Sequence, residues 1–277
     1  MKGCPLRCLW CANPESQDPA LSLMARDVLC QGCGACVKAC AQAAITFTRK
    51  KVRRINRKKC TGCLACVQAC LYHSLTVCGA GMEAKEVLAE VLKDRPFYKN
   101  SGGGVTISGG EPLAQAGFVR ELLEQCKGEG LHTALDTSGY GPWAELEALL
   151  PFVDLLLFDV KHLDSKAHKK ATGKGNELIL ENLEKAASRV PVWLRIPLIA
   201  GFNDSATHIK KIALLGKAPG LRVQKISLLP FHEGGKAKNE QLGRPDQLAD
   251  VKAPSDAHIQ VLKGVCEREG LKTTIGN

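Results

Sequence analysis

Eight cysteines in two equal runs are the residues of this sequence most clearly arranged for chemistry. Each run has the spacing C-x2-C-x2-C-x3-C: Cys30, Cys33, Cys36 and Cys40, then Cys60, Cys63, Cys66 and Cys70. The 18-residue segments that begin at Cys30 and Cys60 share nine identical positions, which indicates an internal duplication. Short gaps let three thiolates converge on one metal centre, and the small residues between them let the backbone wrap closely around it.

The spacing resembles that of bacterial two-cluster ferredoxins, in which the fourth cysteine of each run ligates the other cluster. It predicts one [4Fe–4S] cluster on Cys30, Cys33, Cys36 and Cys70, and a second on Cys60, Cys63, Cys66 and Cys40. The proline that usually follows the fourth cysteine is replaced by Ala41 and Leu71. Zinc is the alternative metal, and two four-cysteine runs of this spacing disfavour it.

Cys4, Cys8 and Cys11 form a separate C-x3-C-x2-C motif with no fourth cysteine close by. A cluster held by three thiolates leaves one iron open, and an open metal position can bind and activate a ligand. The motif resembles the signature of the radical S-adenosylmethionine (SAM) enzymes; chance and a zinc knuckle are the alternatives. The resemblance implies that the amino and carboxylate groups of SAM chelate the open iron, and that one electron then cleaves SAM to methionine and a 5′-deoxyadenosyl radical.

After Cys78 the sequence alternates between apolar runs and amphipathic segments. The pattern predicts strands at 105–108, 131–137, 154–160, 190–198, 222–231 and 271–275, and helices at 83–94, 116–128, 143–150, 176–189, 205–216 and 255–269. The continuous apolar run at 154–160 is typical of a parallel strand buried on both faces. Repeated strand–helix units of this length predict a parallel α/β fold, open or barrel-like.

Polar residues follow the predicted strands at the ends where parallel α/β folds place their chemistry. They are Gly109, Gly110 and Glu111 after the first strand, Asp136 and Thr137 at the end of the second, Asp159 and Lys161 at the end of the third, Arg195 within the fourth and His232 after the fifth. The glycines would let the backbone approach a ligand, Glu111 could accept from an ammonium group, and an inward Arg195 would suit a carboxylate. Alternation puts Asp159 and Lys161 on one side of their strand.

Five segments resemble, in order and spacing, the activating enzymes of glycyl radical enzymes, the pyruvate formate-lyase activating enzyme family. They are GCPLRCLWCANPES, SGGGVTISGGEPL, LDTSG, LFDVKHLD and LLPFHEGGK, and they extend over essentially the whole chain. The eight-cysteine insert resembles the subgroup with a ferredoxin-like domain of two clusters. The resemblance implies a partial parallel (β/α) barrel of the radical SAM type, with the SAM cluster loop at 1–23, the insert at 24–79 and the barrel at 80–277.

The same resemblance assigns roles to single residues. Cys4, Cys8 and Cys11 would hold the catalytic cluster, with Lys161 among the catalytic residues. The implied SAM-binding residues are Trp10, Ala12, Gly109, Gly110, Glu111, Asp136, Thr137, Asp159, Val160, Lys161, Arg195 and His232. Within this set Gly110 would meet the amino-acid end of SAM and His232 would lie by the nucleoside. Asp136 and Thr137 match a monovalent cation site.

The chain departs from the family at its beginning. In the family a strand and a Gly-Pro-Gly segment precede the cluster loop, whereas Cys4 stands almost at the start of this sequence. We therefore expect the first barrel strand to be missing, through truncation or a misassigned start.

The activity that the resemblance implies is hydrogen abstraction from one glycine of a partner glycyl radical enzyme. A reduced flavodoxin or ferredoxin would supply the electron, and the insert would relay it or serve a structural or docking role. Two other functions stay open at this point: a radical SAM enzyme that acts on a small molecule, and a non-catalytic iron–sulfur electron-transfer protein.

Composition narrows the class of protein. The chain has 277 residues, of which 45% are hydrophobic and 24% charged, as in globular proteins and unlike disordered ones. No stretch approaches the roughly 20 apolar residues of a membrane span, and no signal peptide precedes Cys4. Fourteen cysteines in such a chain indicate a reducing compartment, so we expect a cytoplasmic protein.

The net charge of +10 is mostly local. The segment from Arg49 to Lys59 holds eight basic residues and no acidic one, and outside it 30 basic residues face 28 acidic ones. A general nucleic-acid surface is therefore not indicated. The basic segment is either a solvated hairpin or loop, or a docking patch for an acidic protein such as an electron donor.

Overall fold

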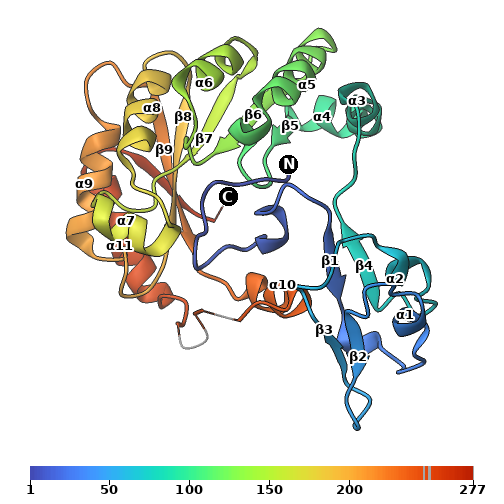
Figure 1. Cartoon of the computed structure of the whole chain (residues 1–277). Helices are drawn as coiled ribbons and strands as arrows, with labels where there is room; N and C mark the ends of the chain where they lie inside the picture. The colour runs from blue at the N-terminus through green and yellow to red at the C-terminus, as the bar shows by residue number, and fades with distance from the viewer. Residues whose placement is uncertain (246, 249–250, 277) are drawn as a thin grey trace.

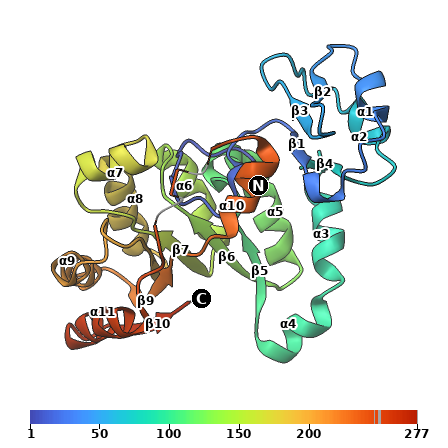
Figure 2. The same ribbon diagram turned by 90° about the horizontal axis from the view of Figure 1, so that it is seen from below.

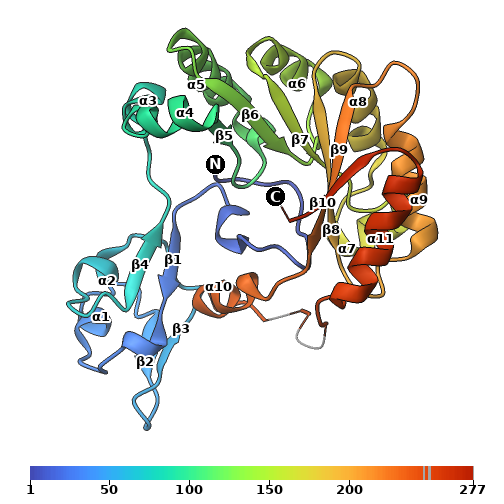
Figure 3. The same cartoon turned by 180° about the vertical axis from the view of Figure 1, so that it is seen from behind.

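Six parallel strands form the main sheet, side by side in sequence order from β5 to β10 (Figures 1 and 3). The computed structural model describes residues 1–245, 247–248 and 251–276. The strands of this sheet are β5 (Gly104–Ile107), β6 (His132–Thr137), β7 (Leu155–Asp159), β8 (Val192–Leu198), β9 (Val223–Pro230) and β10 (Lys272–Ile275). Among the described residues, β5 and β10 lie at the two edges and are not paired with each other, so the sheet is an open, partial barrel.

Helices cover the outer, convex face of the sheet (Figure 3). They are α3 (Ala84–Leu92), α4 (Arg95–Ser101), α5 (Ala116–Gly128), α6 (Trp143–Leu149), α7 (Ser165–Thr172), α8 (Glu177–Ala187), α9 (Ala206–Gly216) and α11 (Asp256–Arg268), while α10 (Gly234–Leu242) lies across the opening. The inward positions of α5 are Val119, Leu122, Leu123 and Cys126, all buried, as their spacing predicts.

The strands bury their two faces unequally. In β7, Leu156 and Phe158 are fully buried against the outer helices, whereas Leu157 and Asp159 are only half-buried on the inner face. The prediction that 154–160 is buried on both faces was therefore wrong for the inner one. That face lines a cavity, and alternation along the strand places the polar side chains there.

The cysteine-rich residues 22–78 form a lobe beside the sheet (Figure 2). It consists of the antiparallel pair β1 (Ser22–Ala25) and β4 (Leu75–Cys78), the hairpin β2 (Ile45–Phe47) and β3 (Arg53–Ile55), and the short helices α1 (Ala35–Lys38) and α2 (Ala65–Gln68). Leu23, Ile45 and Leu75 pack with three of the cysteines into a small core of their own. In the chain, α10 and α11 lie between β9 and β10, and α10 contacts β1 of the lobe.

After Cys78, three helices were missed by the sequence pattern, α4, α7 and α10. α7 (SKAHKKAT) is polar nearly all round and begins at Asp164, whose side chain accepts from the Ala167 N–H. α10 begins with two glycines and has little amphipathic character, and α4 has a proline in its first turn. Tertiary contacts rather than an apolar stripe stabilise such helices, so periodicity does not reveal them.

In the described part of the chain, no helix is both long and apolar enough to cross a membrane.

The sheet core should be sensitive to truncation of a single side chain. Leu194 in β8 is 0% exposed, so Leu194→Ala should lower the free energy of unfolding by about 2–5 kcal/mol through lost burial and a cavity. Leu214 in α9 is 50% exposed, and Leu214→Ala should change stability by less than about 0.5 kcal/mol. Urea unfolding measures both variants. Equal effects of the two would contradict the core assigned here.

Candidate active site

The N-terminal segment lies inside the curve of the sheet, between the sheet and α10 (Figure 1). Its backbone pairs with the loop after β5: the Met1 amino group donates to the Ser108 carbonyl over 2.7 Å, the Gly110 N–H to the Met1 carbonyl over 2.8 Å, and the Glu111 N–H to the Gly3 carbonyl over 2.7 Å. Further along, the Arg7 N–H donates to the Thr172 carbonyl of α7 over 2.7 Å. These bonds bring the three-cysteine loop to the carboxyl ends of the strands.

Gly109 and Gly110 are required by this pairing. Gly109 has a φ of +124°, and a Cβ placed there would collide with Met1; a Cβ on Gly110 would collide with the Gly3 carbonyl. The sequence suggested that these glycines let a ligand come close. In the structure they let the N-terminal segment come close.

Glu111 fixes the next loop rather than standing free. Its side chain is buried, with 1% exposure, and accepts from the Leu113 N–H over 3.2 Å, the Ser138 N–H over 2.8 Å and the hydroxyls of Thr137 and Ser138. These four donors fill the acceptor positions of a carboxylate. Glu111 therefore orients the loop that follows β6, next to Asp136.

A cavity of about 1000 Å³ opens at the carboxyl ends of the strands. It is lined by Cys4, Cys8 and Cys11 and by the predicted residues Trp10, Ala12, Gly109, Gly110, Glu111, Asp136, Thr137, Asp159, Lys161, Arg195 and His232. Val160 is the one predicted binding residue that does not line it: its side chain is 1% exposed and lies in the main core. Because strand residues alternate between faces, Val160 can meet a ligand only through its backbone.

Four charged side chains from three neighbouring strands form a network in this cavity. Arg195 Nη1 lies 2.5 Å from Asp136 Oδ2, and Lys161 Nζ lies 2.6 Å from Asp159 Oδ2. Burial, followed by repulsion from Asp159, raises the pKa of Asp136 in spite of Arg195. Burial also disfavours the charge of Lys161, but the attraction of Asp159 and other nearby anions outweighs it and raises the pKa of this lysine. Two cations thus balance two carboxylates.

Two atoms of this network lack a hydrogen-bond partner among the described residues. They are Asp159 Oδ1 and Arg195 Nε, which are buried and 3.5 Å apart. The two atoms form an ion pair with each other but no hydrogen bond. Buried polar groups are nearly always hydrogen-bonded, so an acceptor and a donor without hydrogen bonds in one cavity fit a polar ligand. The amino-acid and ribose groups of SAM carry donors and acceptors of this kind.

Burial raises the pKa values of all three cysteines of the N-terminal loop, that of Cys4 to about 11 and that of Cys8 to about 12. In the described part of the chain, no three potential ligands converge as a single metal ion would need. A four-iron cluster occupies volume between its thiolates, so three cysteines around one open cavity fit that group better than one ion.

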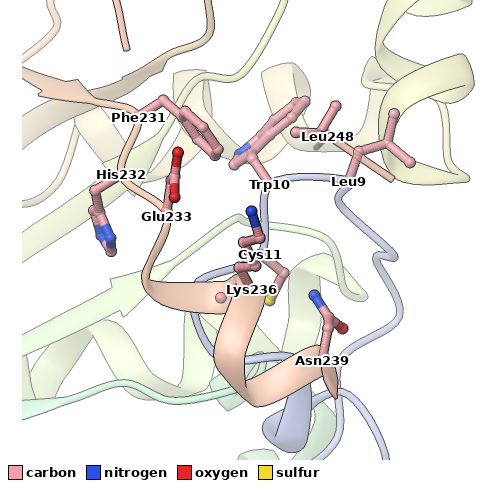
Figure 4. Close-up of a pocket in the computed structure, with 10 residues that line it drawn as sticks. Leu9, Trp10, Cys11, Phe231, His232, Glu233, Lys236, Asn239 and Leu248 are labelled. Atoms are coloured by element: carbon pink, nitrogen blue, oxygen red, sulfur yellow. The ribbon is translucent and has the colours of Figure 1, made fainter. Parts of the chain in front are cut away.

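Aromatic side chains form one side of the cavity. Trp10 and Phe231 also border an adjoining pocket of about 340 Å³, where Figure 4 shows their rings on one wall and His232 on the same turn as Phe231. Behind Trp10, the rings of Phe202, His162 and His208 continue in a row with centroid separations of 5.2, 4.9 and 4.3 Å. Such a surface suits a flat nucleobase.

Two smaller cavities lie in the lobe, each lined by four cysteines. Cys30, Cys33, Cys36 and Cys70 line one of about 260 Å³. Cys40, Cys60, Cys63 and Cys66 line the other, of about 360 Å³. The chain thus brings the fourth cysteine of each run to the other run, in the same two groups that the spacing predicts. Of the other three cysteines, Cys126 and Cys266 are buried in the main core, and Cys78 is half-buried at the end of β4.

Two asparagines that position the site were missed by sequence reasoning. Asn203 donates to the Lys161 and Pro197 carbonyls over 2.8 and 2.7 Å, and Asn182 donates to the Gly139 and Gly141 carbonyls, each over 2.8 Å. Asn182 occupies an inward position of an amphipathic helix. A polar residue at such a position is the signal that could have found it.

Glu111→Gln should loosen the loop after β6. An amide nitrogen cannot accept from the Ser138 N–H, so a buried donor loses its partner at a cost of roughly 1–3 kcal/mol. Glu145 in α6 is exposed, and Glu145→Gln is the matched control. Urea unfolding should show the loss for Glu111→Gln alone. Equal stability of the two variants would mean that the carboxylate does not fix this loop.

Acidification should destabilise the row of rings at His208. Burial, then the neighbours His162 and Lys211, lower the pKa of His208 to about 4 from the ordinary 6.5. The folded state therefore favours the neutral ring, and this contribution to stability is lost as the pH falls from 6.5 towards 4. Between about pH 7.5 and about pH 5.5, His208→Phe should lose roughly 2–4 °C less in melting temperature than the unaltered chain.

The control for this experiment is His132→Phe, at an exposed position in β6. Its melting temperature should fall with pH by the same amount as that of the unaltered chain. An equal fall in His208→Phe would show that His208 does not contribute to the acid sensitivity.

Comparison with known proteins gives this site its context. Residues 1–212 match the radical SAM superfamily. Over 286 aligned residues, covering 100% of this chain and 90% of the relative, the sequence is 40% identical to the (2S)-3-sulfopropanediol dehydratase activating enzyme of Klebsiella oxytoca. It is 38% identical to the trans-4-hydroxy-L-proline dehydratase activating enzyme of Clostridioides difficile, over 99% of this chain and 91% of that protein.

A solved structure of the same family also matches this chain. A domain of a pyruvate-formate lyase-activating enzyme from Bacteroides vulgatus matches with a TM-score of 0.54 and 32% identity, over 63% of this chain and 99% of that domain. With the six-stranded parallel sheet and its three-cysteine loop, these matches show that the chain belongs to the radical SAM superfamily and, within it, to the activating enzymes of glycyl radical enzymes.

Proposed function

We propose that SAM binds in the 1000 Å³ cavity, beside a [4Fe–4S] cluster held by Cys4, Cys8 and Cys11, and that the resulting radical is directed at one glycine of a partner enzyme. When bound, the cluster supplies the electron that cleaves SAM to methionine and a 5′-deoxyadenosyl radical. The observation that carries the proposal is the convergence of the three cysteines with polar side chains from the ends of four strands on one cavity.

The residues of the cavity would divide the binding of SAM among them. Asp159 and Arg195 each offer a buried polar atom that makes no hydrogen bond, and Lys161 holds Asp159 in place. The Gly110 segment would meet the amino-acid end of SAM, and Trp10 and His232 would border the nucleoside. Enclosure matters because a primary alkyl radical reacts with whatever is nearest.

A monovalent cation at Asp136 and Thr137 is a further part of the proposal. Asp136 now pairs with Arg195, and the Thr137 hydroxyl donates to Glu111. A cation that binds Asp136 would therefore have to share that carboxylate with the guanidinium or displace it.

The lobe would hold two further [4Fe–4S] clusters. The support is the pair of four-cysteine cavities and the contacts to their sulfurs: the Ala44 N–H donates to Cys40 Sγ over 3.3 Å, and Ser74 Oγ lies 3.2 Å from Cys70 Sγ. The proposed divisions are 1–23, 24–79 and 80–277. The separate small core of the lobe supports an independent insert, and it includes Leu23 of β1, which favours a first boundary just before Ser22.

The partners follow from the family. The protein substrate would be a glycyl radical enzyme, and the electron donor a flavodoxin or ferredoxin. The relatives are named for activating a sulfopropanediol dehydratase and a hydroxyproline dehydratase, so the partner of this chain would be an enzyme of that general class. All fourteen cysteines are free, which supports a reducing, cytoplasmic location.

The proposal predicts SAM cleavage that depends on the three-cysteine loop. After anaerobic reconstitution with iron and sulfide, the chain should hold about twelve irons, or three clusters of four. With dithionite and SAM it should form 5′-deoxyadenosine. Cys8→Ala should abolish product and lower the iron content to about eight per chain, because only the lobe clusters remain.

The control is Cys126→Ala, a buried core cysteine outside every cavity described here. It should keep its iron and its activity per folded chain. Deoxyadenosine formation by Cys8→Ala at the unaltered rate, or its absence from the unaltered chain with a full complement of iron, would contradict the proposal.

A further inference from the structure

The positive charge of the protein is concentrated on the lobe. Residues 22–79 carry ten basic side chains against the single acidic Asp27, a net charge of +9, while the whole chain has +10. The basic residues are Arg26, Lys38, Arg49, Lys50, Lys51, Arg53, Arg54, Arg57, Lys58 and Lys59. The rest of the chain is therefore almost neutral.

Two of these residues hold the lobe together. Arg53 is buried and donates to Asp27 over 2.6 Å and to Ser74 Oγ over 2.9 Å. Arg57 donates to the Leu23 carbonyl over 2.8 Å and to the Gln241 carbonyl of α10 over 2.9 Å. These contacts account for two of the eight basic residues between 49 and 59 as structural.

The other six, which we call the basic hairpin set, are exposed: Arg49, Lys50, Lys51, Arg54, Lys58 and Lys59. Within residues 1–245, 247–248 and 251–276, none of the six side chains forms an ion pair. A cluster of like charges without counter-charges repels itself, and a partner of opposite charge relieves that repulsion. Arg49, Lys50 and Lys51 lie in the turn of the hairpin and Arg54 lies on β3, whereas Lys58 and Lys59 lie at the other end of β3, just before Cys60. The unpaired charges are therefore densest at the hairpin tip.

The turn of the hairpin is well defined. The Lys51 N–H donates to the Thr48 carbonyl over 2.9 Å, and the Thr48 N–H donates to the Val52 carbonyl over 2.9 Å. Lys51 has a φ of +58°, a left-handed conformation that favours glycine. The sequence keeps a lysine where glycine would fit the backbone better, and its stem lies against Gly32 in the first cysteine loop.

The tip of the hairpin lies by one cluster cavity and its base by the other. Phe47 and Arg53, next to the tip, line the cavity of Cys30, Cys33, Cys36 and Cys70, which we call the outer cavity. Ala44 and Ile45, at the base, line the cavity of Cys40, Cys60, Cys63 and Cys66, which we call the inner cavity.

The inner cavity is the one connected to the barrel. Leu23 of β1 lines it, and Arg57 links Leu23 to α10. From its other side α10 reaches the three-cysteine loop: Asn239 borders a pocket together with Cys8 and Cys11. Figure 1 shows the same order in space, with the hairpin tip pointing away from the sheet and α10 between β1 and the N-terminal segment.

Apolar side chains are exposed beside the outer cavity. Leu71 is 82% exposed and follows Cys70, Tyr72 lines the cavity, and Val28 is 93% exposed. The Arg26 N–H donates to the Ser74 carbonyl over 2.8 Å, which sets the segment of Val28 beside that of Leu71. An apolar patch with a charged rim is typical of a protein-docking surface.

We propose that a small acidic electron-carrier protein docks on Arg49, Lys50 and Lys51 of the basic hairpin set and on the Val28–Leu71 patch. It delivers its electron to the outer cluster first, from which the electron passes to the inner cluster and then to the barrel. The inference rests on the proposed function, because it uses the two lobe clusters and the SAM cluster. In each step one electron leaves the donor and reduces the acceptor, and no bond forms or breaks. Charge complementarity selects the acidic carrier over a neutral or basic one.

The first test reverses two charges of the hairpin in the reconstituted full chain. Lys50→Glu/Lys51→Glu should slow reduction of the lobe clusters by a reduced acidic ferredoxin at least tenfold at low ionic strength, as roughly expected for lost electrostatic steering. The difference should shrink at high salt, where charges are screened. Stopped-flow absorbance gives the second-order rate constant. Lys169→Glu/Lys170→Glu in α7 is the control of equal charge change, and it should behave as the unaltered chain.

Dithionite separates this inference from the proposed function. All these variants should form 5′-deoxyadenosine normally with dithionite, since a small reductant needs no docking surface. An equal slowing in both double variants, or none in the hairpin variant, overturns the docking site. Slower glycyl radical formation with dithionite in the hairpin variant, together with an unchanged rate of reduction by ferredoxin, would assign the basic set to the glycyl radical partner instead and overturn the proposal.

The second test concerns the order of the clusters. In Cys63→Ala, which alters the inner site, ferredoxin should still reduce the outer cluster at the normal rate. In Cys33→Ala, which alters the outer site, reduction of the inner cluster should slow at least tenfold. Iron content shows whether each cysteine variant keeps its other lobe cluster. If a variant loses both clusters, Leu71→Glu tests the same docking surface, because it leaves every cysteine in place. The reverse pattern of rates would overturn the order.

Discussion

The backbone pairing between the N-terminal segment and the loop after β5 is the interaction on which the site depends. Three cysteines near the start of a chain are of no use unless something holds them against the ends of the strands. Here Met1 and Gly3 pair with residues 108–111, and two glycines allow the close approach. Glu111, immediately afterwards, ties this loop to the next one through three hydrogen bonds, from the Thr137 hydroxyl and from the N–H and hydroxyl of Ser138. One short segment thus fixes both walls of the cavity.

Charge balance then decides what the cavity can hold. Asp136, Asp159, Lys161 and Arg195 come from neighbouring strands and neutralise one another, so the site can be buried without a net charge. Burying them unpaired would cost several kcal/mol each. The two atoms that remain without hydrogen bonds mark where a polar ligand completes the network. For a family that cleaves SAM and forms a radical on another protein, such preorganisation positions the substrate and excludes water.

The lobe depends on a different source of stability from the barrel. A segment of fewer than 60 residues buries too little apolar surface to be very stable by itself, and its core consists largely of the cysteines with a few aliphatic side chains. We therefore expect cluster binding to contribute much of its folding free energy. Arg57 and the contact between α10 and β1 join it to the barrel at one end, which leaves the hairpin end free for another molecule.

Sequence determined the parts of this protein that are encoded locally. Cysteine spacing predicted which four side chains share each lobe cavity, and the alternation of strands and helices predicted six parallel strands with boundaries within about two residues. The polar residues predicted at the strand ends meet in one cavity, because parallel strands all end at one edge, but its lining also includes residues that the pattern did not indicate, such as Ser138, Pro197 and Phe231. The sequence pattern did not predict helices such as α7 and α10, because they lack an apolar stripe.

Only the tertiary structure decided what those residues touch. Glu111, expected to receive an ammonium group, is occupied by its own chain, Val160 faces the core, and Asn182 and Asn203 hold loops from elements distant in sequence. Of eight basic residues in one run, the fold buries Arg53, uses Arg57 as a link and leaves six exposed. Spacing along a chain gives the period of an element, but partners across the fold depend on how the elements pack, and that is set by all of their contacts together.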